Sequence, residues 1–179
     1  MTLIALLRAI NVGGRVVRMD RLRAVVEAQG FVGVETFIAS GNVVFEGRAS
    51  QARKAERTIE RALLSELGYQ VATFVRTSAE LAAVAEHEPF PQTAIERAAT
   101  FSIGFLKEAL DRDAAARLMG LRTDADDFHL RGREVYWLST LRQSESKFNN
   151  AVFERVVGVS ATFRSISTVR KLAAKYPAE

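Results

Sequence analysis

The chain contains no cysteine and only two histidines, His87 and His129, in its 179 residues. Without cysteine it cannot form disulfides, zinc–thiolate sites or a cysteine nucleophile, and two isolated histidines are too few to build a histidine-rich metal centre alone. The sequence also lacks a Gly-rich P-loop, a His-Glu-x-x-His pair and a nucleophile elbow. Any catalysis must therefore use other groups, and no cofactor is predicted.

Targeting and membrane segments are also missing. The start, Met1-Thr2-Leu3, has neither the basic region nor the small-residue cleavage site of a signal peptide, and no apolar run approaches the roughly 18 residues that a membrane span needs. We therefore expect a cytoplasmic protein with no membrane partner. The composition, 48% hydrophobic and 26% charged, is that of a soluble globular chain of one or two domains. A formal charge of +4 slightly favours anionic partners.

Apolar periodicity indicates one order of elements that occurs twice: strand, helix, strand, strand, helix, strand. Turn and helix-end signals separate the segments, including Gly30, Gly68 and Gly158 after predicted helices and Ser50 as a predicted helix cap. The first set is predicted at residues 3–10, 19–30, 34–39, 42–46, 50–68 and 71–75. The second set is predicted at residues 101–106, 111–119, the hairpin 128–138, 148–156 and from 161 onward.

The repeated order predicts an α+β protein of two tandem ferredoxin-like (βαββαβ) halves that arose by internal duplication, each with a trailing helix. Ala161-Thr162-Phe163 opens the last strand just as Ala72-Thr73-Phe74 does in the first half, and Thr77-Ser78-Ala79-Glu80 is a capping box that would begin the first trailing helix. The stretch Glu86–Pro91 breaks helix and strand alike. We expect an N-terminal half at 1–87, a linker at 88–95 and a C-terminal half at 96–179.

Arg8 interrupts an apolar run, residues 3–12, that otherwise has the pattern of a buried strand. A charge there is costly unless an anionic or hydrogen-bonding partner meets it, and that partner is either protein or ligand. The ferredoxin-like topology places the first and third strands side by side and antiparallel, so Arg8 and Asn11 should approach the turn Ser40-Gly41-Asn42. Both residues can face one site only if the strand bends before Gly13-Gly14, whose freed N–H groups could cradle an anion.

These segments also carry a family resemblance. The run Ile4-Ala5-Leu6-Leu7-Arg8-Ala9-Ile10-Asn11-Val12-Gly13-Gly14, the turn Ser40-Gly41-Asn42-Val43, the pair Ser146-Lys147 and the stretch Thr162–Val169 resemble motifs of the domain of unknown function 1697 family. The resemblance spans nearly the whole chain. It implies two ferredoxin-like halves and no established activity.

The chain departs from the family pattern at Ala9, where Gly is usual, at Glu88, where Asn is expected, and at Ser165-Ile166, which replaces Asn-Trp. A stacking or hydrogen-bonding role is therefore not expected at the last two places. Lys147 lies at the start of a predicted helix, where a cation opposes the helix dipole, which favours a task other than helix stability. The predicted ligand-binding residues are Arg8, Asn11, Gly13, Gly14, Ser40, Asn42, Lys147 and Arg164.

Three functions are compatible with this set. The first is binding of a small anionic ligand, a nucleotide or phosphorylated metabolite, and the others are nucleic-acid binding and an enzyme acting on a phosphorylated substrate. An RNA-recognition platform lacks its aromatics, because the first strand has none, the third has only Phe45, and the adjacent Tyr136 and Trp137 point to opposite faces.

A structural role is the alternative to all three functions. Arg8 would tie the sheet to a loop, Asn11, Ser40 and Asn42 would form turns, and Arg164 would be a solvated charge on an edge strand. His87 and His129 are expected in exposed loop or strand positions.

Overall fold

The structure, a computed structural model, describes residues 1–11 and 13–178, and this part of the chain forms two four-stranded antiparallel sheets and seven α-helices. The predicted α+β class is confirmed. The chain divides into two compact units, Met1–Ala83 with Lys171–Glu179, and Val84–Arg170. Among the described residues, no helix has both the length and the apolar character needed to cross a membrane.

The first sheet has the strand order β2-β3-β1-β4, so β1 lies between β3 and β4 and is antiparallel to both. The predicted central pair is confirmed by Leu6 of β1, which lies opposite Asn42, the first residue of β3. The elements of this region are β1 (Thr2–Leu7), α1 (Met19–Glu27), β2 (Glu35–Phe37), β3 (Asn42–Glu46), the 3-10 turn η1 (Ala49–Gln51), α2 (Ala52–Leu67), β4 (Thr73–Thr77) and α3 (Ser78–Glu86).

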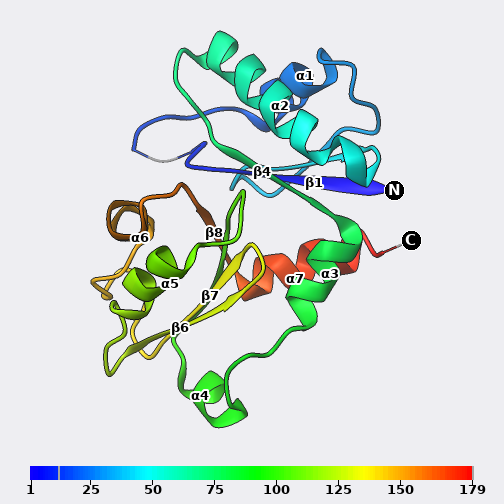
Figure 1. Ribbon diagram of the computed structural model, residues 1–179. Coiled ribbons are helices and arrows are strands. Elements are labelled where there is room, and N and C mark those ends of the chain that lie inside the picture. The colour runs from blue at the N-terminus through cyan, green and yellow to red at the C-terminus, as the bar shows by residue number, and fades with distance from the viewer. Residues whose placement is uncertain (12, 179) are drawn as a thin grey trace. The chain divides into compact units, whose positions relative to one another are not determined.

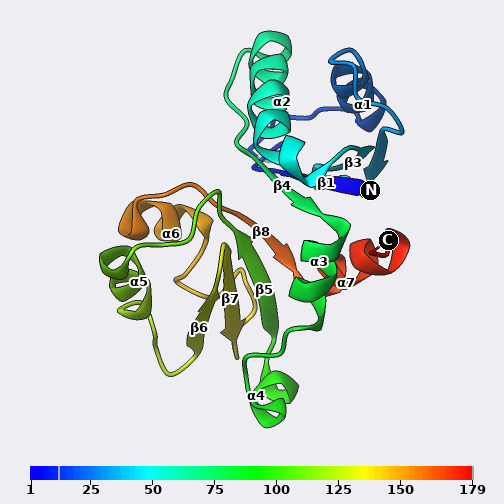
Figure 2. The same cartoon turned by 45° about the vertical axis from the view of Figure 1, so that its right-hand side comes forward.

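Helices α1 and α2 lie side by side on one face of this sheet (Figures 1 and 2). Because side chains alternate along a strand, Leu3, Ala5 and Leu7 all point to that face. They are buried with the inward residues of the helices, among them Leu22 and Ile59. This core fixes where β1 ends and therefore where the loop after it begins.

The outer edge of β4 is capped by two carboxylates of α2. The buried Glu56 accepts a hydrogen bond from the N–H of Val75 at 2.9 Å, and Glu60, one turn further along α2, accepts one from Thr73 at 2.9 Å. An edge strand otherwise exposes unpaired N–H groups to other chains. The two glutamates satisfy these donors and protect the edge.

The second sheet has the matching order β6-β7-β5-β8, with α5 and α6 together on one face (Figure 2). Its core is rich in aromatic side chains, with Trp137, Phe148 and Phe163 in mutual edge contacts. The elements of this region are α4 (Gln92–Arg97), β5 (Thr100–Phe105), α5 (Arg112–Met119), β6 (Asp126–Arg131), β7 (Glu134–Ser139), α6 (Asn150–Val157), β8 (Thr162–Ser165) and α7 (Ile166–Lys175).

Several predicted element ends are confirmed and one cap is wrong. The capping box before α3 is present, since Thr77 N–H donates to Glu80 at 2.8 Å and Glu80 N–H donates to the Thr77 hydroxyl at 3.1 Å. Gly68 and Gly158 end α2 and α6 in the left-handed conformation. Ser50 does not cap α2, because it lies within η1, which leads directly into the helix.

The C-terminal segment contacts the edge strand β2. The Tyr176 hydroxyl donates to the Glu35 carboxylate at 2.7 Å, Lys175 Nζ lies 3.3 Å from the same oxygen, and Tyr176 meets the ring of Phe37 edge-on. The hydrogen bond from Tyr176, followed by that from Lys175, holds the pKa of Glu35 below its usual value of 4.5. Burial raises the pKa of Tyr176.

We expect this contact to weaken in acid. Because the pKa of Glu35 is lower in the folded protein, its contribution to stability is present above about pH 4.5 and is lost as the pH falls through the folded-state pKa. Glu35→Gln should therefore be less stable than wild type at pH 7, by a small amount because these groups are exposed, and the difference should be smaller at a pH well below 4.5. Denaturant unfolding at both pH values measures this, and a constant difference would contradict the assignment.

Candidate functional site

The candidate site in the first unit begins where β1 ends. Leu7 N–H donates to Gly41 O at 2.8 Å and Arg8 N–H donates to Ala72 O at 2.9 Å, so the backbone of Arg8 is held although the strand ends one residue earlier. The next residue, Ala9, has a φ of 53°. The chain therefore bends before Gly13, as expected, and the predicted strand to residue 10 is too long. The side chain of Arg8 is half-buried.

Asn11 and Asn42 bind backbone groups of the surrounding loops. Asn11 Nδ2 donates to Ala39 O at 2.8 Å while its Oδ1 accepts from Val17 N–H at 2.7 Å. Asn42, fully buried, donates to Phe37 O at 2.9 Å and to the Ser40 hydroxyl at 2.8 Å. Asn11 thus reaches the turn at Ala39, Asn42 bonds Ser40 within the turn, and both amides shape the loops.

The turn between β2 and β3 packs tightly on the end of β1. Gly41 has a φ of 78°, and a Cβ added there would lie 2.5 Å from Ile10 Cγ2 and 3.2 Å from Leu7 Cβ. Ile38, in the same turn, has a φ of 49°. Positive φ in a β-branched residue is costly and persists only where the surroundings impose it.

The loop between Asn11 and α1 exposes its glycines. Gly13 and Gly14 are exposed with φ of 63° and 80°, and a Cβ at either would have no atom within 4 Å. Arg15 lies over the ring of Tyr69, with Cζ 4.2 Å from the ring centroid. Val12 of the resemblance lies outside the described residues.

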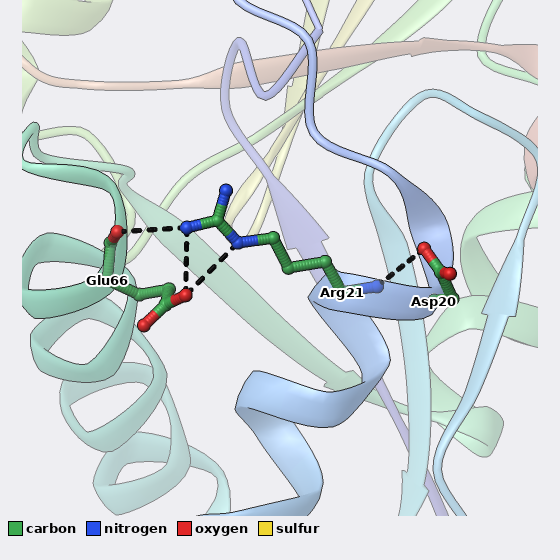
Figure 3. A network of polar contacts seen from close by, with 3 residues as sticks. All are labelled: Asp20, Arg21 and Glu66. Carbon is green, nitrogen blue, oxygen red and sulfur yellow. Dashed lines mark hydrogen bonds and ion pairs between the residues drawn. The ribbon is translucent and has the colours of Figure 1, made fainter.

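The far end of this loop is fixed at the start of α1. The Arg21 guanidinium donates to Glu66 Oε1 at 2.8 and 3.1 Å and to Glu66 O at 3.3 Å, which ties α1 to the end of α2 (Figure 3). Asp20 accepts from Arg21 N–H at 2.9 Å and pairs with Arg18. The backbone bond from Arg21, then the Arg18 side chain, lowers the pKa of Asp20.

Lys147 is exposed in the loop that precedes α6, which begins at Asn150 after its cap, Asn149. The prediction that Lys147 opens the helix is therefore wrong, and the argument from the helix dipole does not apply. Its neighbour Ser146 donates to both carboxylate oxygens of the buried Asp126, at 3.0 and 3.1 Å. The Ser-Lys pair is thus anchored through Ser146.

Arg164 is buried in β8, an edge strand, and is not the solvated charge that the structural alternative expected. Its Nη1 donates to the Thr162 hydroxyl at 2.8 Å and to Phe163 O at 2.9 Å. Burial lowers the pKa of Arg164 to about 10, so the guanidinium remains charged at neutral pH.

The two histidines, 42 residues apart in sequence, form a pair that the sequence did not predict. Their Nε2 atoms lie 3.4 Å apart, and both rings are half-buried beside Tyr136. Burial, then the charges of Arg131 and His129, lower the pKa of His87. Burial raises the pKa of Tyr136 to about 12.

A pocket of about 400 Å³ lies at the opposite end of β1 from Arg8. Its lining includes the apolar residues Leu3, Phe31 and Phe45 and the polar residues Gln51 and Lys54. Among the described residues that line it, none belongs to the predicted site. Sequence reasoning missed this pocket because its lining residues belong to ordinary core and helix patterns.

Comparisons with known proteins agree with this architecture. The family model described as "Protein of unknown function (DUF1697)" matches residues 1–136. A conserved bacterial protein from Streptococcus pneumoniae, SP0830, has a similar solved structure, with a TM-score of 0.76 and 23% sequence identity over 99% of this chain and 98% of that one. No curated protein matches the sequence. The structural likeness concerns the fold alone.

Proposed function

We propose that this chain, which belongs to the DUF1697 family of proteins of unknown function, binds a small anionic ligand such as a nucleotide or phosphorylated metabolite at the loop after β1. The observation that carries the proposal is the double hydrogen bond of Asn11, to Ala39 O at 2.8 Å and from Val17 N–H at 2.7 Å. These bonds hold the glycine-containing loop closed. A loop fixed before binding loses less entropy when a ligand arrives.

The loop has donors suited to an anion. Gly13 and Gly14 are exposed, have positive φ and have open space at the Cβ position, which suits their N–H groups to bind a phosphate oxygen. Arg15 Cζ lies 4.2 Å from the ring centroid of Tyr69, and a guanidinium held over a ring can still donate charge-assisted hydrogen bonds. Arg8 lies at the base of the loop.

Titration calorimetry with inorganic pyrophosphate and with ATP, at low salt, tests the proposal. We expect Arg15→Gln to weaken binding about tenfold, which corresponds to the loss of one charge-assisted bond, and Arg8→Ala to weaken it at least as much. Arg23→Gln, on the exposed surface of α1, removes the same charge and should leave the affinity unchanged. No binding of either phosphate, or equal losses in Arg15→Gln and Arg23→Gln, would contradict the proposal.

Nucleic-acid binding has less support. Of the aromatic residues on the central strands, Phe45, Phe105, Tyr136 and Trp137 are buried, and Phe101 is half-buried against the ring of Phe90. Base stacking needs exposed rings. Ligand binding by Lys147 and Arg164 stays a prediction, and the experiments on Arg15 and Arg8 do not test it.

We also infer that the two halves are ferredoxin-like units related by duplication, and two buried arginines support this. Arg76 lies opposite Ile4 in β4 and donates to Val75 O at 3.0 Å, while Arg164 lies opposite Ile103 in β8 and donates to Phe163 O at 2.9 Å. Each arginine thus bonds the carbonyl of its preceding residue at the same place in its sheet.

The register of the two sheets supports the same equivalence. Leu7 N–H bonds Gly41 O, just before β3, and Leu106 N–H bonds Arg133 O, just before β7. When the two sheets are aligned on these hydrogen bonds, Arg76 occupies the same position as Arg164. In that alignment Ala72-Thr73-Phe74 lies one residue out of register with Ala161-Thr162-Phe163. We keep residues 88–95 as the proposed boundary between the halves, because Pro91 precedes the short helix α4 there.

A further inference from the structure

We propose that His87 and His129 form a two-histidine site for a divalent transition-metal cation that prefers nitrogen ligands, with Zn²⁺ as the probe. Both residues belong to the unit Val84–Arg170, so the proposal is independent of the anion site in the first unit. Imidazole nitrogen is a preferred ligand of Zn²⁺, Cu²⁺ and Ni²⁺.

The separation of the two nitrogens matches that of two ligands on one tetrahedral ion. With zinc–nitrogen bonds of about 2.05 Å at a tetrahedral angle, two imidazole nitrogens lie about 3.3 Å apart. The Nε2 atoms of His87 and His129 are 3.4 Å apart. Without a metal, one ring can donate a long hydrogen bond to the other at this distance, which exceeds the usual value near 3 Å.

The orientation of the rings agrees with the same geometry. If both Nε2 lone pairs converge on one ion, the ring centroids should be about 5.2 Å apart. They are 5.4 Å apart, with an interplanar angle of 42°. The centroid distance therefore agrees with two Nε2 lone pairs that converge on one point beside the line joining the nitrogens.

The surroundings hold both rings in place. Tyr136 contacts His87 edge-on at 5.1 Å between centroids and His129 at 6.1 Å, so one buried ring positions both imidazoles. Among the described residues no group of three or more His, Cys, Asp or Glu is placed to hold a metal. The remaining coordination positions would be taken by water, since both histidines are only half-buried.

One charge acts on the pair, and a second acts on the tyrosine beside it. The positive charge of Arg131 acts on His87 and opposes a bound cation, and Glu134 acts on the neighbouring Tyr136. Arg131 should therefore limit the affinity. Hard cations such as Mg²⁺ and Ca²⁺, which prefer oxygen ligands, should not bind here.

The test is calorimetric titration of the full, untagged chain with Zn²⁺, after removal of metal with a chelator. Because the chain has two histidines and no cysteine, each variant removes half of its imidazoles. We expect one Zn²⁺ per chain, a loss of affinity of at least tenfold in His87→Gln and in His129→Gln, and no binding of Mg²⁺. Circular dichroism of the metal-free variants checks that they fold.

Arg131→Gln distinguishes a metal site from a histidine pair that only stabilises the fold. Removing this like charge should raise Zn²⁺ affinity several-fold, whereas Arg112→Gln, an equal charge change at an exposed position in α5, should not. The proposal is overturned if wild type binds no Zn²⁺ at millimolar concentration, or if both histidine variants bind as tightly as wild type, since carboxylates would then hold the ion.

Discussion

Gly41→Ala is expected to lower the free energy of unfolding by about 3 kcal/mol, because two costs add at this position. Its φ of 78° lies in the left-handed region, which costs an alanine about 1 kcal/mol. The new Cβ would also lie 2.5 Å from Ile10 Cγ2, so the end of β1 and the turn must move apart. Denaturant unfolding followed by circular dichroism measures the loss.

Gly68→Ala is the matched control. Gly68 has nearly the same φ, 77°, but a Cβ there meets no atom within 4 Å, so this variant should lose only about 1 kcal/mol. The difference between the two variants isolates the contact with Ile10. Equal losses would mean that the turn does not pack on β1 as tightly as the structure indicates.

The position of this turn beside β1 follows from the sequence, whereas the role of its side chains does not. Apolar periodicity and turn residues are enough to pair the first and third strands, and that pairing brings Asn11 to Ala39, next to the turn Ser40-Gly41-Asn42. Whether an amide meets a backbone carbonyl or a ligand depends on the path of the loop. That path is set by residues such as Ala9 and Ile38. Both have a positive φ, which no sequence pattern predicts for an alanine or an isoleucine.

The burial of Arg164 also could not be predicted from the sequence. Arg164 has the sequence context of an edge strand, which predicts exposure, yet it is buried and bonded to Thr162. The register that relates it to Arg76 depends on hydrogen bonds between strands, and the Ala-Thr-Phe repeat indicates a different alignment. The His87–His129 pair joins a loop to β6 and belongs to no local motif, so only the tertiary structure brings it together.

Asp126→Ala is expected to cost about 4 kcal/mol, because it leaves the buried indole N–H of Trp137 without a partner and removes the hydrogen bonds from the Ser146 and Thr123 hydroxyls to a buried carboxylate. Asp126 is 4% exposed and accepts from Trp137 Nε1 at 2.9 Å, from the Ser146 hydroxyl at 3.0 Å and from the Thr123 hydroxyl at 3.2 Å. The indole N–H can only donate, so no rearrangement of Trp137 satisfies it. Denaturant unfolding gives the loss, and fluorescence of Trp137, the chain's one tryptophan, reports the change at the hydrogen bond itself.

Two variants separate the hydrogen-bond network from a general effect of charge. Asp126→Asn keeps a carbonyl for Trp137 and gives Ser146 an amide donor that its hydroxyl can accept, so it should recover most of the stability, to within about 1.5 kcal/mol of wild type. Asp127→Ala removes the same charge at the adjacent position. The Asp127 carboxylate pairs with Arg122 at the surface, so this variant should cost under about 1 kcal/mol. If Asp126→Ala lost no more than Asp127→Ala, the carboxylate would not be the group that holds Ser146 and, through it, the Lys147 loop on the core of the second unit.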